Sequence, residues 1–269
     1  MFRPNSDFQP KILSTTKRVR GVLNGKYIFD TTAAKLVWEH KFFPQYWIPK
    51  SDFLQTATFT DHLPTSGSGT QWSTSTLSVV GNSKSVQTLI VPDSFNSELA
   101  GLVKIEFKAL DAWYEEQAPV LYHPKDPFHR VDILPSGRHL RVELDGVVLA
   151  DTGSEGGVMS LWETNFPGRW YLPPTAVNWE YLVPSDTHTG CPYKGEASYY
   201  HAVVKGKEVK DVVWWYKNPT LESGLIAGML CFYPDKVDTW VDGTAIEKVG
   251  MPNMKKPTPD EEDKSKQEK

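Results

Sequence analysis

The sequence has 269 residues, of which 39% are hydrophobic and 23% charged, with a formal net charge of −4. This composition is typical of a globular protein with room for two domains, each able to bury a core. The acidic balance offers no basic field for phosphate neutralisation, so we expect no nucleic-acid partner. No apolar run approaches the roughly 18 residues that a membrane span needs, so we expect no membrane association.

Targeting and cysteine content place the protein in a reducing compartment. Residues 1–7 lack the apolar core of a secretory signal. Cys191 and Cys231 are too few for a disulfide framework or a four-cysteine zinc site, and we expect free thiols. The histidines are scattered along the sequence, and His188 with Glu196 is the one pair that could still ligate a metal ion. The sequence therefore predicts a cytoplasmic protein, with the nucleus as the alternative, and neither a dedicated metal site nor a cofactor.

The first half of the chain reads as antiparallel sheet. Asn24-Gly25 stands between two alternating runs, a pattern typical of a two-residue hairpin turn, with Val19, Gly21 and Leu23 facing a core. Residues 65–69 are rich in serine and glycine and predict a flexible loop. Residues 102–107 predict another strand. Residues 119–137 contain four prolines and one glycine and predict a linker.

The second half repeats these signals. Asp145-Gly146 predicts a hairpin with Leu140, Val142 and Leu144 facing the core. A short helix is expected at residues 173–177, because proline is tolerated in a first helical turn. Strands are expected at residues 199–204, 211–216 and 229–233, and another hairpin turn at residues 242–243. From residue 252 the tail is charged and proline-rich. It has too few apolar side chains for burial to offset the entropy lost on folding, so we expect it to be disordered.

A set of short motifs occurs twice in the same order. The spacing within each block is unchanged, while the offset between copies drifts from 121 to 124 and then 127 residues. This indicates a duplicated domain with small insertions between blocks. The paired motifs are Asn24-Gly25 with Asp145-Gly146, Trp38-Glu39 with Trp162-Glu163, Ala100-Gly101 with Ala227-Gly228, and Asp111-x-Trp113 with Asp238-x-Trp240.

Two related, compact, antiparallel all-β domains are therefore predicted, joined by the proline-rich linker. The first copy is assigned to residues 12–124, the second to residues 131–249, and a disordered charged tail to residues 250–269.

The second copy alone contains the segment Cys191-Pro192-Tyr193-Lys194-Gly195-Glu196. Its glycines and proline indicate a non-regular loop carrying a thiol, an amine and a carboxylate. Lys194 with Glu196 could perform acid-base work, and Cys191 could act as a thiolate nucleophile next to a cation. The alternative is a packing loop with a small buried cysteine and a solvated ion pair.

A second group of candidates surrounds Arg169. A guanidinium beside aromatic rings suits recognition of a carboxylate or phosphate, whereas the first copy has Gln45 at this position and no charged anchor there. The alternative is that the large aromatic residues form the core. The predicted ligand-binding residues are Trp162, Glu163, Arg169, Tyr171 and Tyr193.

Residues 139–245 resemble domain-of-unknown-function family 427, through the Leu161-Trp162-Glu163 and Arg169-Trp170-Tyr171-Leu172-Pro173 strings and the specific Cys191-Pro192-Tyr193-Lys194-Gly195 motif. Residues 18–118 look like a degenerate member without that motif. The resemblance implies compact all-β domains with a β-tent architecture, similar to methionine sulfoxide reductase B and the ligand-binding domain of cereblon. It also carries a nucleotidyltransferase-like label.

Three functions follow as alternatives. The first is binding of a small polar or anionic ligand in the second copy, as a binding protein or an accessory metabolic enzyme. The second is a structural or protein-interaction module. The third is nucleotidyl transfer, although the sequence shows no carboxylate pair arranged to hold Mg²⁺ against a triphosphate.

Overall fold

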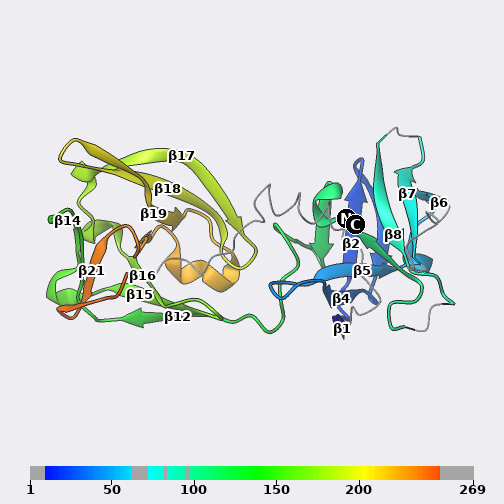
Figure 1. The fold of residues 1–269 in the computed structure, drawn as a ribbon, viewed down its shortest axis with the longest axis horizontal. Coiled ribbons are helices and arrows are strands. Elements are labelled where there is room, and N and C mark those ends of the chain that lie inside the picture. Colours follow the sequence, from blue (N-terminus) through cyan, green and yellow to red (C-terminus); the bar gives the residue numbers. More distant parts are fainter. Residues whose placement is uncertain (1–9, 62–71, 82–83, 95–96, 249–269) are drawn as a thin grey trace, which may run out of the picture. The chain divides into compact units, whose positions relative to one another are not determined.

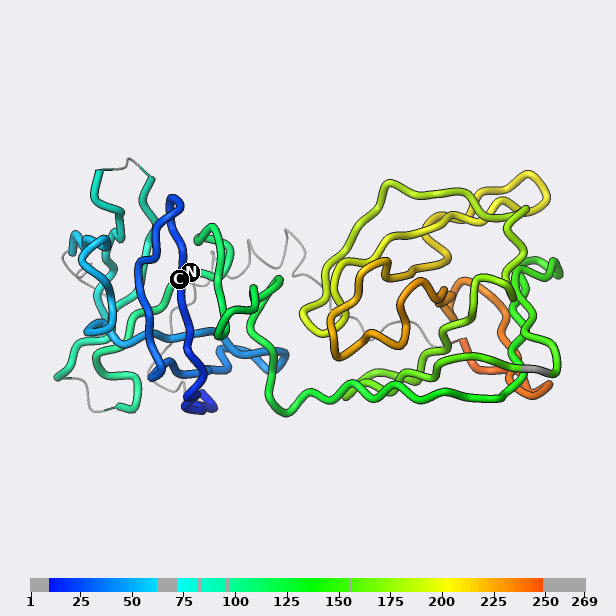
Figure 2. The backbone as a smooth tube through the Cα atoms, turned by 180° about the vertical axis from the view of Figure 1, so that it is seen from behind, coloured from blue at the N-terminus to red at the C-terminus, as the bar shows by residue number. Residues whose placement is uncertain are grey.

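The computed structural model describes residues 10–61, 72–81, 84–94 and 97–248, and the chain divides into two compact units between Pro127 and Phe128. The predictions made for residues 65–69 and 250–269 fall outside the described residues. Both units consist of antiparallel strands with short 3-10 helices between them (Figures 1 and 2). No described helix has the length and apolar character that a membrane span requires.

The first domain contains a seven-stranded and a four-stranded sheet. The larger has the order β1-β4-β5-β9-β8-β7-β6 and the smaller the order β11-β10-β2-β3. The strands are β1 (Lys11–Ser14), β2 (Val19–Leu23), β3 (Lys26–Thr31), β4 (Lys35–Trp38), β5 (Gln45–Pro49), β6 (Ala57–Asp61), β7 (Ser73–Val79), β8 (Ser85–Ile90), β9 (Leu102–Ile105), β10 (Ala112–Glu115) and β11 (Ala118–Pro119); the 3-10 helices are η1 (Lys50–Asp52) and η2 (Phe107–Ala109).

The second domain repeats this topology strand for strand. Its sheets have the orders β12-β15-β16-β20-β19-β18-β17 and β14-β13-β21-β22. The strands are β12 (Val131–Ser136), β13 (Leu140–Leu144), β14 (Val147–Asp151), β15 (Val158–Glu163), β16 (Arg169–Leu172), β17 (Leu182–Cys191), β18 (Gly195–Val204), β19 (Lys207–Tyr216), β20 (Leu230–Phe232), β21 (Asp238–Val241) and β22 (Thr244–Ala245); the 3-10 helices are η3 (Gly153–Glu155), η4 (Pro174–Ala176), η5 (Trp179–Tyr181) and η6 (Leu221–Ile226). The all-β fold and the tandem pair of similar domains are thus confirmed.

The predicted hairpin turns form where expected. Asn24-Gly25, Asp145-Gly146 and Asp242-Gly243 all have positive φ at both turn residues, the conformation that type I′ turns require. The expected inward residues Leu140, Val142 and Leu144 are buried.

The predicted linker at residues 119–137 is too long. Val131–Ser136 forms β12 within it, and Pro135 is accommodated because β12 is an edge strand of the larger sheet. The short helix expected at residues 173–177 is present as the 3-10 helix η4.

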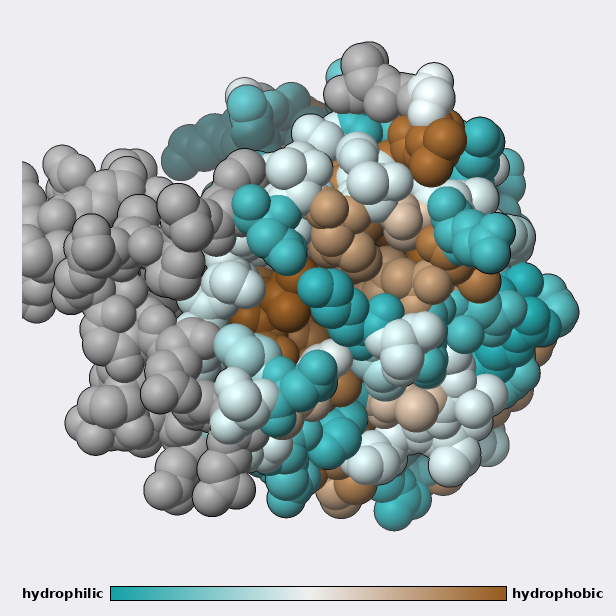
Figure 3. Space-filling model, turned by 90° about the vertical axis from the view of Figure 1, so that its right-hand side faces the viewer, coloured by the Kyte–Doolittle hydropathy of each residue, from teal (hydrophilic) through white to brown (hydrophobic). Residues whose placement is uncertain are grey.

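Each domain buries apolar residues on both faces of its larger sheet. In the second domain, Leu172, Leu230 and Phe232 face the smaller sheet, and Tyr171 and Cys231 face the opposite side. We call this opposite side, with Leu161, Tyr199, Trp214 and Tyr216, the inner face. In the first domain, the end that carries β6 to β8 shows hydrophobic patches interrupted by polar residues (Figure 3).

Candidate functional site

The segment that contains Lys194 is part of a regular hairpin, so the prediction of a non-regular loop is wrong. β17 pairs with β18 as far as Cys191 and Gly195, and only residues 192–194 form the turn. The carbonyl of Tyr193 accepts hydrogen bonds from the hydroxyls of Thr220 (2.5 Å) and Ser223 (3.1 Å). The turn is therefore held against η6, and the Lys194 side chain starts from a fixed position.

Lys194 reaches a carboxylate 31 residues away in the chain. Its Nζ lies 2.5 Å from Oε2 of Glu163, and Nε2 of His129 lies 2.9 Å from Oε1 of the same carboxylate. The side chains of Lys194, Glu163 and His129 are 10%, 11% and 13% exposed. These three residues, which we call the Glu163 cluster, form a nearly buried charged group at the end of β15.

No sequence pattern points to His129. It precedes β12, inside the predicted linker, and no motif surrounds it. Its ring stacks on Tyr193 at 4.2 Å between centroids, so Tyr193 contacts the cluster through the imidazole. A histidine between Phe128 and Arg130 carries no signal of a partner 34 residues further along the chain.

The cluster changes the acidity of Glu163. Burial raises the pKa of this carboxyl group, but the hydrogen bond with His129 and the charge and hydrogen bond of Lys194 outweigh burial, and the pKa lies below its ordinary value. Glu163 is therefore a carboxylate at neutral pH, paired on both oxygens.

Two other predicted residues share the inner face with the cluster. Arg169 and Tyr171 alternate with Trp170 and Leu172 along β16, and both are buried. The Tyr171 hydroxyl accepts a hydrogen bond of 2.9 Å from the indole of Trp214. Burial raises the pKa of the neighbouring Cys231 thiol to about 12, although the charges of Arg169 and Lys194 act to lower it. Two cations thus act on this thiol.

Three predicted residues are not brought into the cluster. The Glu196 side chain is 67% exposed and lies 3.9 Å from His188, not beside Lys194. Trp162 is 48% exposed, and its indole donates to Ser160 on the face opposite Glu163. Cys191 is a half-buried free thiol at the end of β17. Lys194 is thus paired with Glu163, and the pairing with Glu196 suggested by sequence proximity does not form.

The first domain has a buried carboxylate at the equivalent position, Glu39, with a lysine from a different strand. Nζ of Lys104 on β9 lies 2.6 Å from Glu39, and the two side chains are 1% and 5% exposed. Nε1 of Trp47 donates to the other oxygen at 3.0 Å. Lys104 and Trp47 pair across β9 and β5, as Cys231 and Tyr171 pair across β20 and β16. The first domain therefore has a charged anchor that the sequence comparison did not find.

The environments of the two carboxylates differ. For Glu39, burial is the largest effect and is not fully offset by Lys104, so its pKa lies above the ordinary value. Glu163, with two ionisable partners, has a lowered pKa. The second domain thus holds its carboxylate with groups from a turn and from the segment before the first strand, whereas the first domain uses groups inside the sheet.

The chain belongs to the family described as a domain of unknown function (DUF427), which matches residues 11–116 and 132–243. The two matches correspond to the two domains. No curated protein matches the chain. Within the part of the chain that the structure describes, no group of three or more histidine, cysteine, aspartate or glutamate side chains is placed to hold a metal ion.

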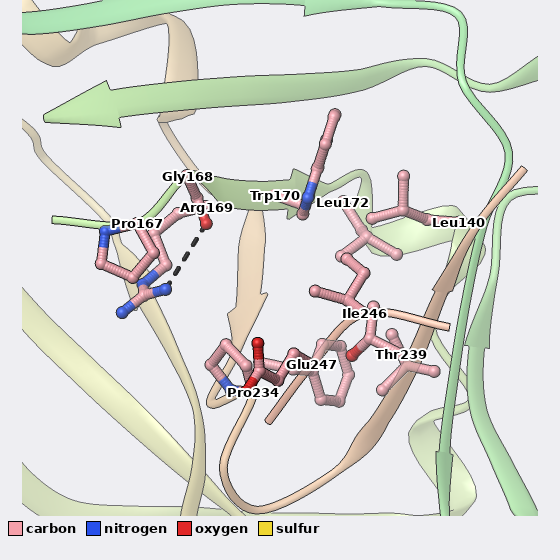
Figure 4. Close-up of a pocket in the computed structure, with 12 residues that line it drawn as sticks. Leu140, Pro167, Gly168, Arg169, Trp170, Leu172, Pro234, Thr239, Ile246 and Glu247 are labelled. Atoms are coloured by element: carbon pink, nitrogen blue, oxygen red, sulfur yellow. Dashed lines mark hydrogen bonds between the residues drawn. The ribbon is translucent and has the colours of Figure 1, made fainter. Parts of the chain in front are cut away.

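A pocket of about 70 Å³ lies in the second domain, on the other face of the larger sheet from the Glu163 cluster. Leu172 and Phe232, which face the smaller sheet, line it (Figure 4). The Arg169 side chain runs toward Gly168, whose carbonyl lies 3.4 Å from it, and away from Leu140 and Ile246. We place the charged chemistry at the cluster, because the pocket walls are mainly apolar.

Proposed function

We propose that the second domain binds a small anionic or polar ligand at the Glu163 cluster. The observation that carries this proposal is that Lys194 and His129 hold the two oxygens of one nearly buried carboxylate. A ligand carboxylate or phosphate offers the same oxygen acceptors, so it can replace Glu163 as their partner.

The charge of the inner face supports an anionic ligand. Arg169 and Lys194 both act on the Cys231 thiol, while Glu163 supplies one negative charge. In a region of low dielectric, such cationic groups act strongly on a charged ligand, which favours an anion. The aromatic rings of Tyr193 and Tyr171 suit the apolar part of such a ligand.

Comparison with the first domain supports a ligand rather than a purely structural role. Lys104 is 1% exposed within β9, where its backbone is part of the sheet. Lys194 projects from a turn and its side chain is 10% exposed, so this flexible side chain can turn away from Glu163 more readily than that of Lys104. The second domain thus has a lysine that can exchange partners.

A structural role is the second candidate, and one observation favours it. Both oxygens of Glu163 are already paired, so the cluster is satisfied as it stands. In that case the cluster fastens the β17–β18 turn and the segment before β12 to β15, and no ligand is needed.

Isothermal titration calorimetry on the full chain separates the two functions. The probes are phosphate, acetate, citrate and adenosine monophosphate, titrated into wild type, Lys194→Met and Glu196→Gln. Glu196→Gln is the matched control, because its side chain lies two residues from Lys194 but points outward. We expect Lys194→Met to weaken binding of the best probe at least about tenfold, a difference of about 1.4 kcal/mol, and the control to bind normally. Equal binding by both variants would remove the cluster from the ligand site.

A further inference from the structure

The pocket between the two sheets of the second domain lies where the first domain is filled. Residues on β13, β16, β20 and β21 line it, together with residues that precede β16 or follow β20 and β22. Figure 4 shows Leu140, Thr239 and Ile246, all from the smaller sheet or the residues after it, gathered along this space next to Leu172 of β16. Because the two domains share one topology, the pairing of their strands shows what occupies the same place in the first domain.

Strand pairing identifies Thr239 as the counterpart of Trp113. β2 and β13 are equivalent strands, and Gly21 and Val142 are equivalent positions, since each follows an arginine paired with Asp30 or Asp151. Trp113 stands opposite Gly21, and Thr239 stands opposite Val142. The equivalence of Trp113 with Trp240, which the repeated Asp-x-Trp motif suggests, does not hold in the structure.

A shorter connection explains the change of register. Ile105 and Phe232 end equivalent strands, but residues 106–111 connect β9 to β10, whereas only residues 233–237 connect β20 to β21. A slip of one residue in a strand moves its side chains to the other face. Trp240 therefore lies opposite Arg141, and Thr239 takes the inward position.

An indole fills this inward position in the first domain. Trp113 is 2% exposed and lies between Tyr46 and Phe107, with ring centroids at 5.4 and 5.5 Å. Its Nε1 donates a hydrogen bond of 2.8 Å to the carbonyl of Phe107. In the first domain, a planar ring with one hydrogen-bond donor is thus part of the core.

The second domain keeps the surroundings of this ring but not the ring. Trp170 is equivalent to Tyr46, and Pro234 to Phe107; both line the pocket together with Thr239. Ala150 replaces Phe29, which packs against Trp113 at 5.3 Å, and Val142 in place of Gly21 restores part of the volume. The pocket is what remains after these replacements.

We propose that this pocket binds one planar aromatic ring of a small ligand, in the place that the Trp113 indole fills in the first domain. An enclosed cavity of about 150 Å³ holds a benzene molecule, and this pocket measures about 70 Å³. The pocket is partly open to solvent, so one edge of the ring fits into it, while the other edge and the rest of the ligand stay in solvent. Thr239 and Glu247, which line the pocket, offer oxygen acceptors for a ring N–H.

The test uses indole as the probe, the full-length chain as the protein and saturation-transfer NMR as the assay. We expect indole to bind with a Kd on the order of 1 mM, and cyclohexanol, which is not planar, to bind more weakly. Thr239→Trp places the missing indole on β21 and is expected to weaken binding at least about tenfold. Thr239→Leu fills the same space with a smaller side chain and serves if the first variant does not fold.

A matched variant in the first domain completes the test. Trp113→Thr opens the equivalent space there and is expected to add a second indole site to the chain. Lys194→Met is expected to leave indole binding unchanged, because Lys194 lies on the other face of the sheet, so this proposal and the proposed anion site can fail separately. No indole binding up to about 10 mM, or equal binding by folded Thr239→Trp or Thr239→Leu protein, would overturn the proposal.

Discussion

Replacing each buried lysine by methionine is expected to destabilise the two domains by different amounts. In Lys104→Met, the carboxylate of Glu39 stays buried, with only the indole of Trp47 as a partner. Removing one partner of a buried ion pair costs about 3–5 kcal/mol. In Lys194→Met, His129 still contacts Glu163, whose side chain is 11% exposed. Because this carboxylate keeps its hydrogen bond with His129, we expect a loss of about 1–3 kcal/mol.

Hydrogen exchange with mass spectrometry measures both effects in the full chain, because peptides from each domain report that domain's stability separately. A single unfolding transition would not, since a chain with two domains need not unfold in one step. The double variant Lys104→Met with Glu39→Leu is expected to regain most of the stability, because well-packed apolar replacements of buried pairs are often neutral. Equal losses in the two domains, or a larger loss for Lys194→Met, would refute the distinction drawn between the two carboxylates.

Three further predictions concern acidity, thiol reactivity and packing. Because the pKa of Glu163 is lowered in the folded state, its pairing stabilises the second domain at pH values above the unfolded-state pKa, and this stability is lost as pH falls through the folded-state pKa. In hydrogen exchange below pH 4.5, Glu163→Gln should therefore lose less stability with falling pH than wild type. The same dependence of stability on pH in both proteins would contradict this prediction. Iodoacetamide should modify the half-buried Cys191 in native protein and spare Cys231, whose pKa is about 12, until unfolding; early modification of Cys231 would contradict the burial described. Gly21→Ala would place a Cβ 2.3 Å from the Phe29 ring and should destabilise the first domain by about 3 kcal/mol, as measured by hydrogen exchange of its peptides. Gly137→Ala, with no heavy atom within 4 Å of the added Cβ, should be neutral.

The sequence predicted those turns and strands that are determined by residues close together in the chain. The Asn-Gly and Asp-Gly pairs specify turns because they tolerate positive φ, and the alternation from Leu140 to Leu144 specifies which face is buried. β12 was missed because Pro135 reads as a break in the pattern, yet an edge strand accepts it.

The site was only partly predictable, because its contacts connect distant parts of the chain. Glu163, Lys194, Arg169, Tyr171 and Tyr193 were identified as candidates, and the structure places them on or next to one face of a sheet. The pairing of Lys194 with Glu163 rather than with Glu196 depends on strand alternation, which turns Glu196 outward beside the inward Ala197.

The first domain's lysine was missed for a related reason. Lys104 lies in the run that predicts a strand, and its counterpart is Cys231, so aligning the two copies shows no shared charge. Only the pairing of β5 with β9 shows that it reaches Glu39. The one-residue change of register at β21 is equally invisible in the sequence, because the spacing from Gly228 to Trp240 equals that from Gly101 to Trp113.

A crystal structure of the full chain with the anion that binds best in calorimetry tests the central claim most directly. We expect density for the anion within hydrogen-bond distance of Lys194 and His129, with the Glu163 carboxylate displaced from Nζ of Lys194. If Glu163 keeps both of its partners and the anion lies elsewhere, the cluster only stabilises the packing of the β17–β18 turn against β15, and the second domain does not bind its ligand there.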